Sequence, residues 1–126
     1  MKDENGKMPE DLKSRTKRFA LRIVHLYTAL PKSNEAQVIG KQVLRSGTSV
    51  GAHYRESVRA RSDAEFVSKI EGALQELEET SYWLELLVEA KIIKEKLMSN
   101  LIDECDELAA ILTTCVKHAK QRMKNK

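Results

Sequence analysis

The sequence predicts an all-α protein, an antiparallel up-down-up-down four-helix bundle, from its composition and its periodicity. Only two prolines occur among 126 residues, and both precede residue 32. The chain is 41% hydrophobic and 33% charged, a balance typical of helices that bury one face. Four segments repeat apolar residues every three or four positions, and none alternates with period two. Short breaks separate these segments, so neighbouring helices are expected to run antiparallel.

The first expected helix covers about residues 11–30. Phe19, Ile23, Leu26 and Leu30 recur at spacings of four, three and four, which places them on one face. Pro31 cannot continue the helix, and Ser33 or Asn34, two and three residues later, can cap the next one.

The second and third expected helices carry equally regular apolar stripes. The second covers about residues 34–60, with Ile39, Val43, Val50 and Tyr54 on one face. The third begins at a cap on Ser62 or Asp63. Its stripe consists of Phe66, Ile70, Ala73, Leu77, Leu84 and Leu87, with a polar step at Thr80.

The fourth expected helix follows a short break near Lys91. Its apolar positions are Leu97, Leu101, Cys105, Leu108, Leu112, Cys115 and Ala119. No linker or repeat divides the chain, so residues 1–126 are expected to form a single domain. Residues 1–10 and 121–126 are expected to be flexible ends.

Small residues form an unusual strip on the second helix. Gly40, Leu44, Gly47 and Gly51 lie four, three and four apart. Glycine costs a helix interior roughly 0.5–1 kcal/mol relative to alanine, so three of them on one strip need an explanation. A strip without side chains lets another backbone approach closely. We interpret it as a helix-packing or oligomer interface; glycines that a packed bundle merely tolerates are the alternative.

A polar stripe beside the glycines is expected to join this interface. Arg45 and Glu56 lie three turns apart, too far to pair within one helix, so each is expected to pair with another helix or subunit. Glu79, one turn before Trp83, is a candidate for a partly buried pair with Arg45 or Lys69. The complete oligomer or helix-packing set is Gly40, Arg45, Ser46, Gly47, Ser49, Gly51, Tyr54, Glu56, Lys69, Glu79 and Trp83.

Charge is unevenly distributed along the chain, although the net charge is only +3. Basic residues gather near both ends, whereas residues 62–90 hold eight acids against Lys69 alone. In an up-down bundle the start of the first helix and the end of the fourth lie at the same end, where their charge would attract a polyanion. The candidate nucleic-acid-binding residues are Lys13, Arg15, Lys17, Arg18, Arg22, Lys117, Lys120, Arg122 and Lys124. Aromatic residues are scarce, so backbone-directed binding is expected.

Motifs for catalysis, metals or cofactors are not found. "GTSVG" lacks the Gly-Lys-Ser/Thr ending of a phosphate-binding loop, and no glutamate has a histidine three residues later. Cys105 and Cys115 lie ten residues apart, about 15 Å along one helix, too far for a disulfide. We therefore expect neither an enzyme nor a bound cofactor. Without a signal peptide or a membrane span in the sequence, a cytoplasmic location is expected.

Several motifs resemble those of a known family. The block Arg45-Ser46-Gly47-Thr48-Ser49-Val50-Gly51-Ala52 is followed by Tyr54, Glu56, Phe66, Lys69, Glu79 and Tyr82-Trp83-Leu84. Over residues 14–120 the chain resembles the small four-helix bundle proteins encoded within intervening sequences of bacterial 23S rRNA genes. One departure is His53, which stands where that family usually has asparagine, so an amide-specific contact is not expected there.

The resemblance implies a homopentameric ring of bundles without enzymatic activity. Accessory proteins of diversity-generating retroelements are similar in fold and act as nucleic-acid-binding partners of a reverse transcriptase. Two functions therefore compete. The first is a non-catalytic homo-oligomer that binds RNA or DNA through basic end surfaces. The alternative is a structural or adaptor module that binds another protein without nucleic acid.

Overall fold

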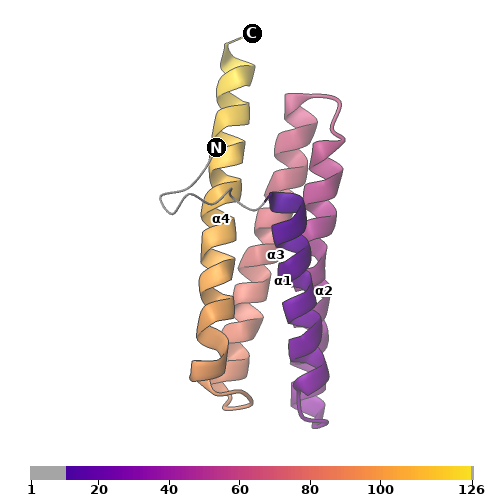
Figure 1. Ribbon diagram of the computed structural model, residues 1–126, viewed down its shortest axis with the longest axis vertical. Coiled ribbons are helices and arrows are strands. Elements are labelled where there is room, and N and C mark those ends of the chain that lie inside the picture. Colours follow the sequence, from indigo (N-terminus) through magenta and orange to yellow (C-terminus); the bar gives the residue numbers. More distant parts are fainter. Residues whose placement is uncertain (1–10, 126) are drawn as a thin grey trace.

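The computed structural model describes residues 11–125, and all its regular structure is helical (Figure 1). The helices are α1 (Leu12–Ala29), α2 (Asn34–Val58), α3 (Asp63–Glu89) and α4 (Glu95–Lys124). The expected all-α class and the four helices are confirmed. Residues 11–125 contain no strand. The flexibility expected for residues 1–10 and 126 lies outside the described residues.

Local signals set most helix boundaries. The Asp11 carboxylate accepts a hydrogen bond from the Ser14 N–H at 2.8 Å, and the Ser62 hydroxyl accepts one from the Glu65 N–H at 3.1 Å. Both are N-caps that satisfy otherwise unpaired helix donors. After α3 the backbone of Lys91 adopts φ 60°, which ends the helix and turns the chain toward α4. α4 continues to Lys124 and so extends past its last buried residue, Ala119.

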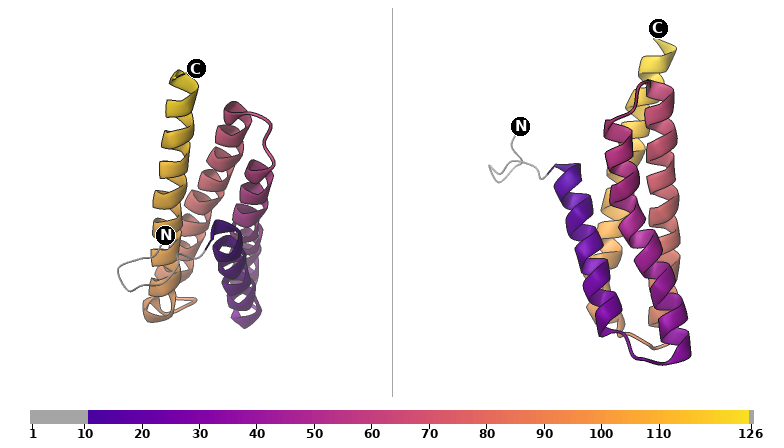
Figure 2. Two further views of the ribbon diagram at one scale, coloured as in Figure 1. Left: turned by 45° about the horizontal axis from the view of Figure 1, so that its top comes forward. Right: turned by 90° about the vertical axis from the view of Figure 1, so that its right-hand side faces the viewer.

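Consecutive helices pack along their lengths, with early residues of one beside late residues of the next. Lys69 of α3 contacts Glu56 of α2, and Arg122 at the end of α4 contacts Asp63 at the start of α3. Figure 1 shows the chain turning back at each connection. The right-hand view of Figure 2 shows α1 leaning away from the other helices toward its N-terminal end.

The core follows the predicted stripes with one clear error. Phe19, Ile23, Val50 and Leu108 are fully buried, and so is the α3 stripe with its polar step, except for the partly buried Phe66. Leu97 was expected in the core, but 69% of its surface is exposed. Leu97 instead lines an open hollow together with Leu26 and other residues of α1.

The glycine strip of α2 packs against α1 of the same chain. A Cβ on Gly40 would lie 2.5 Å from Leu30 Cδ1, and one on Gly47 would lie 2.7 Å from Ile23 Cγ1. At Gly51 the nearest atom would be Thr16 Oγ1 at 3.2 Å. The glycines are therefore needed for close helix packing within one chain. They are buried there, so this strip is covered before any second copy could reach it.

Candidate functional site

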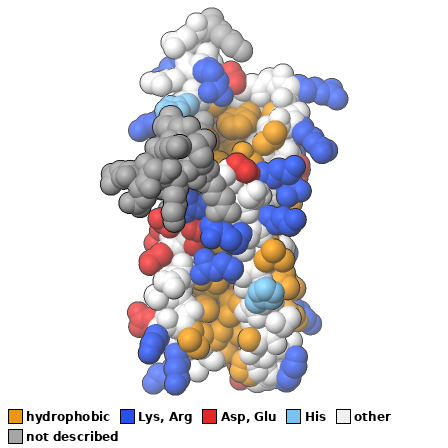
Figure 3. All heavy atoms as spheres, viewed as in Figure 1, with side chains coloured by type: hydrophobic (Ala, Val, Ile, Leu, Met, Phe, Trp, Pro, Cys, Tyr) orange, Lys and Arg blue, Asp and Glu red, His pale blue; other side chains and the backbone are white. Residues whose placement is uncertain are grey.

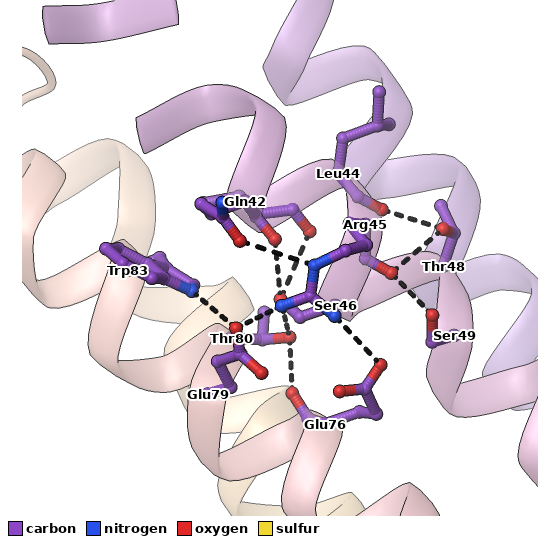
Figure 4. A network of polar contacts seen from close by, with 11 residues as sticks. Gln42, Leu44, Arg45, Ser46, Thr48, Ser49, Glu76, Glu79, Thr80 and Trp83 are labelled. Carbon is purple, nitrogen blue, oxygen red and sulfur yellow. Dashed lines mark hydrogen bonds and ion pairs between the residues drawn. The ribbon is translucent and has the colours of Figure 1, made fainter. Parts of the chain in front are cut away.

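The polar stripe of α2 joins α2 to α3 (Figure 4). The Arg45 guanidinium reaches across to the carboxylates of Glu76 and Glu79, and its Nε donates to Gln42 Oε1 at 3.3 Å. Trp83 Nε1 donates to Glu79 Oε1 at 3.2 Å, which orients that carboxylate toward Arg45. The pairing expected between Arg45 and Glu79 is confirmed, and it lies within one chain.

A buried hydroxyl pair lies beneath this ion pair. Thr80 Oγ1 and Ser46 Oγ are 2.7 Å apart, and both residues are fully buried. Each hydroxyl also lies within hydrogen-bond reach of a carbonyl one turn earlier on its own helix, Glu76 O and Gln42 O. The polar step of the α3 stripe is thus satisfied inside the α2–α3 contact.

The remaining polar-stripe residues also have partners within the chain. Lys69 Nζ lies 2.9 Å from Glu56 Oε2, and this pair lowers the pKa of Glu56 and raises that of Lys69. Ser49 donates to the Arg45 carbonyl at 2.7 Å, whereas half-buried Tyr54 packs against the core. Burial raises the pKa of the Tyr54 phenol, which therefore stays neutral at physiological pH. These residues have structural contacts that a folded single chain already uses.

His53 carries a buried nitrogen without a hydrogen-bond partner. Its Nδ1 lacks a partner among the described residues and faces Gly72 of α3, where a Cβ would approach it to 3.2 Å. The aromatic ring thus occupies the space that a side chain at position 72 would need. Glycine at position 72 is explained by this contact.

The predicted nucleic-acid-binding residues do not form one surface. Arg15 makes a short, partly buried pair with Glu104, with Nη2 2.7 Å from Oε1, and also reaches Glu107. That pair lowers the pKa of Glu104, through the Arg15 hydrogen bonds first. Lys120 lies 3.5 Å from Glu71, and Arg122 lies 3.2 Å from Asp63. These three basic residues are therefore already engaged in joining α4 to α1 and α3.

The other predicted basic residues divide between two places. Lys13 and Lys17 are exposed on the first turns of α1, and Lys117 and Lys124 on the last turns of α4; none of the four forms an ion pair within residues 11–125. Arg18 is also exposed, but it interacts with another group of this chain. Arg22 lies farther along α1 and lines a groove in the other half of the bundle.

Three arginines that the sequence interpretation missed lie at the same end of the bundle as Lys13. Lys13, Arg55 and Arg59 surround a small hollow of about 100 Å³ whose apolar lining comes from Tyr54 and Val58. Arg61 borders the adjoining hollow of about 370 Å³ at the α2–α3 connection, together with Val58 and Arg122. Val58, which both hollows share, is 64% exposed.

We call the set Lys13, Arg55, Arg59 and Arg61 the basic end. None of these side chains forms an ion pair within the described part of the chain. The spacing of the three arginines along the end of α2 was visible in the sequence. Their position beside the start of α1 follows from the turn back between α1 and α2, which brings the two ends together. Cationic side chains without intramolecular partners are free to contact phosphates.

An open groove lies between α1 and α4 at the opposite half of the bundle. It encloses about 690 Å³ and is walled by Leu26 from α1, Ile93 from the α3–α4 connection, and Met98 and Leu101 from α4. Figure 3 shows hydrophobic side chains gathered between α4 and α1 in the lower half of this face.

Groups with catalytic potential are few in the described chain. No cluster of three metal-ligating side chains occurs within residues 11–125. Cys105 is buried, and burial raises the pKa of its thiol to about 12, so it stays protonated and unreactive. Cys115 is half-buried, and burial raises its pKa as well. No described helix combines the length and apolarity that a membrane crossing needs.

The fold and these surfaces define a small all-α protein whose exposed features are a basic end and an apolar groove. Residues 11–114 match the family described as 23S rRNA-intervening sequence protein, and the chain belongs to this family. The resemblance seen in the sequence motifs is thereby confirmed.

A solved structure gives an independent match to the fold. It is a crystal structure of a protein with unknown function from the S23 ribosomal protein family of Bacteroides thetaiotaomicron VPI-5482. The two chains are 39% identical, the match covers 85% of this chain and 99% of that one, and the TM-score is 0.80. No curated protein matches the sequence.

Proposed function

We propose that this protein is a non-catalytic homo-oligomer, a pentameric ring of antiparallel bundles in the bacterial cytoplasm. It binds RNA or DNA through its basic end. The observation that carries the proposal is the grouping of Lys13, Arg55, Arg59 and Arg61 without intramolecular ion pairs. Lys117 and Lys124 extend the same charge along the end of α4. A cyclic oligomer would repeat this set once per subunit on one side of the ring, so modest contacts would act together on one strand.

The mode of binding follows from the side chains present. The exposed arginine and lysine side chains of the basic end can reach phosphate oxygens of either nucleic acid. Among the residues that line the small hollow beside Val58, the aromatic one is Tyr54, whose ring is partly buried. A stacking platform needs several exposed rings. Binding should therefore depend strongly on salt and weakly on base sequence.

Fluorescence anisotropy over a salt series tests this proposal with single-stranded RNA, single-stranded DNA and duplex DNA. The triple variant Arg55→Gln, Arg59→Gln, Arg61→Gln should bind more weakly and show a flatter dependence of log affinity on log salt. The slope changes by about 0.7 to 0.9 for each phosphate contact removed. A matched control, Lys32→Gln, Lys41→Gln, Lys96→Gln, removes three exposed charges elsewhere on the bundle and should bind like the parent.

Other outcomes would decide against this function. If none of the three nucleic acids binds at about 50 mM salt, where phosphate contacts are strong, the protein-binding adaptor role replaces nucleic-acid binding. Strong preference for one base sequence would contradict the backbone-directed mode. Equal losses in the test and control variants would show that overall charge, not the basic end, determines binding.

A further inference from the structure

The groove between α1 and α4 is an apolar surface with a cationic rim. Its lining includes the cationic side chains of Arg22 and Lys94, together with His25 of α1. Neither Arg22 nor Lys94 forms an ion pair within residues 11–125. Leu97 lies on the α4 side and is 69% exposed. A large exposed leucine beside a groove of this size is typical of a protein-binding surface.

A surface of the opposite character lies on α3. Tyr82 is 54% exposed, and its ring contacts Trp83 edge to face at 5.0 Å between centroids. Glu78, Glu85 and Glu89 lie four residues before, three after and seven after Tyr82, so all share its helix face. None of these carboxylates forms an ion pair in the described part of the chain. We call Glu78, Tyr82, Glu85 and Glu89 the acidic face.

The acids of this face repel one another. Glu85 lies close enough to Glu89 to raise the pKa of that carboxyl, through a side-chain hydrogen bond first and like-charge repulsion second. A cation brought to this face would relieve the repulsion. Within the described chain, the cation nearest in sequence to the acidic face is Lys91, which lies beyond the end of α3.

The two surfaces lie at the same level of the bundle. The groove is built from the end of α1, the α3–α4 connection and the start of α4. Glu85 and Glu89 occupy the last two turns of α3, directly before that connection. In a ring whose bundles stand parallel to its axis, surfaces at the same level of neighbouring subunits meet each other.

We propose that the occupant of the α1–α4 groove is a second copy of this chain, which inserts its acidic face so that Tyr82 covers the apolar floor and Glu85 and Glu89 meet Arg22 and Lys94. This inference rests on the proposed homo-oligomer and names the surfaces that form it. The contact joins two different surfaces, so it is head-to-tail and closes into a ring at a suitable rotation. Every basic end then lies on one side of the ring.

Charge reversal tests this pairing. The groove variant Arg22→Glu, Lys94→Glu and the face variant Glu85→Lys, Glu89→Lys should each sediment as monomers, since like charges would oppose every contact. Combining the four substitutions in one chain should restore assembly. The control variant Lys32→Glu, Lys41→Glu reverses two exposed charges on the α1–α2 side and should assemble like the parent. Circular dichroism checks that each variant is folded.

Mixing the two variants gives a second, independent readout. The groove variant retains an intact acidic face, and the face variant retains an intact groove. An equimolar mixture should therefore assemble through the intact face of one variant and the intact groove of the other. The substituted groove and face carry reversed, complementary charges, so they should also pair in the mixture. Any species larger than a monomer supports the pairing.

The outcomes separate this inference from the proposed function. A parent protein that sediments as a monomer of about 14.3 kDa at micromolar concentration overturns both the oligomer and this interface. A parent oligomer whose size is unchanged in both reversal variants overturns only the interface. Folded variants that stay monomeric in mixture and in the fourfold combination also overturn it, because reversal then damaged something other than this pairing.

Discussion

The two sides of α1 differ sharply. Toward α2, Gly40, Gly47 and Gly51 remove every side chain that would separate the helices, and Ile23 and Thr16 pack directly onto the bare backbone. Toward α4, Arg15 pairs with Glu104 and Glu107, and a groove of about 690 Å³ stays open below these pairs. One helix therefore has one closed side and one open side.

This difference shows how small residues decide where a bundle closes. Close approach of α1 to α2 draws α1 toward that neighbour, and the side chains between α1 and α4 do not fill the space that remains. The open side leaves Leu97 exposed, whereas the closed side buries even a threonine, Thr16. A surface for a partner is thus the consequence of tight packing elsewhere on the same helix.

The largest expected effect comes from disrupting the closed side. Gly47→Leu should lower the free energy of unfolding by about 2–3 kcal/mol, because even its Cβ would lie 2.7 Å from the fully buried Ile23. Thermal denaturation measures the change. Ala52→Leu places the same side chain on an exposed position of α2 and should stay within about 0.5 kcal/mol of the parent. Equal melting temperatures would show that the glycine strip is not a tight contact.

The next effect concerns the ion pair on the open side. Glu104→Ala should cost about 2 kcal/mol, since it leaves the partly buried Arg15 without its main acceptor. Glu107→Ala is the control: that carboxylate is farther from Arg15, at 3.4 Å, and largely exposed, so its loss should cost less. Equal losses would mean that the pair with Glu104 has no special role.

The same pair should make stability depend on pH. Arg15 lowers the pKa of Glu104 in the folded state from its ordinary value of 4.5, so the unfolded chain binds the proton more readily. The stabilisation is complete above pH 4.5 and is lost as the pH falls through the lower, folded-state pKa. The difference in melting temperature between the parent and Glu104→Ala should therefore shrink below pH 4.5. A difference that stays constant as the pH falls well below 4.5 would contradict the assignment.

The smallest expected effect concerns the hydroxyl pair between α2 and α3. Ser46→Ala and Thr80→Val should each cost about 1 kcal/mol, because each hydroxyl keeps one backbone acceptor after its partner is removed. The double variant should cost less than the sum, since both single substitutions remove the same hydroxyl–hydroxyl contact. Chemical denaturation of the four proteins measures the coupling. Strict additivity would show that the 2.7 Å contact contributes nothing.

The sequence alone determined the helices and most of the core, because each helix repeats its apolar residues with the period of the α-helix and local signals such as Pro31 or Ser62 mark the boundaries. It also indicated that Glu79 pairs with Arg45 or Lys69, and the fold selected Arg45. Tertiary structure decided what each face meets. It placed the glycine strip against α1, engaged Arg15 with Glu104, and left Leu97 exposed. Periodicity fixes the direction in which a side chain points, but the neighbour it reaches depends on how closely the helices approach one another.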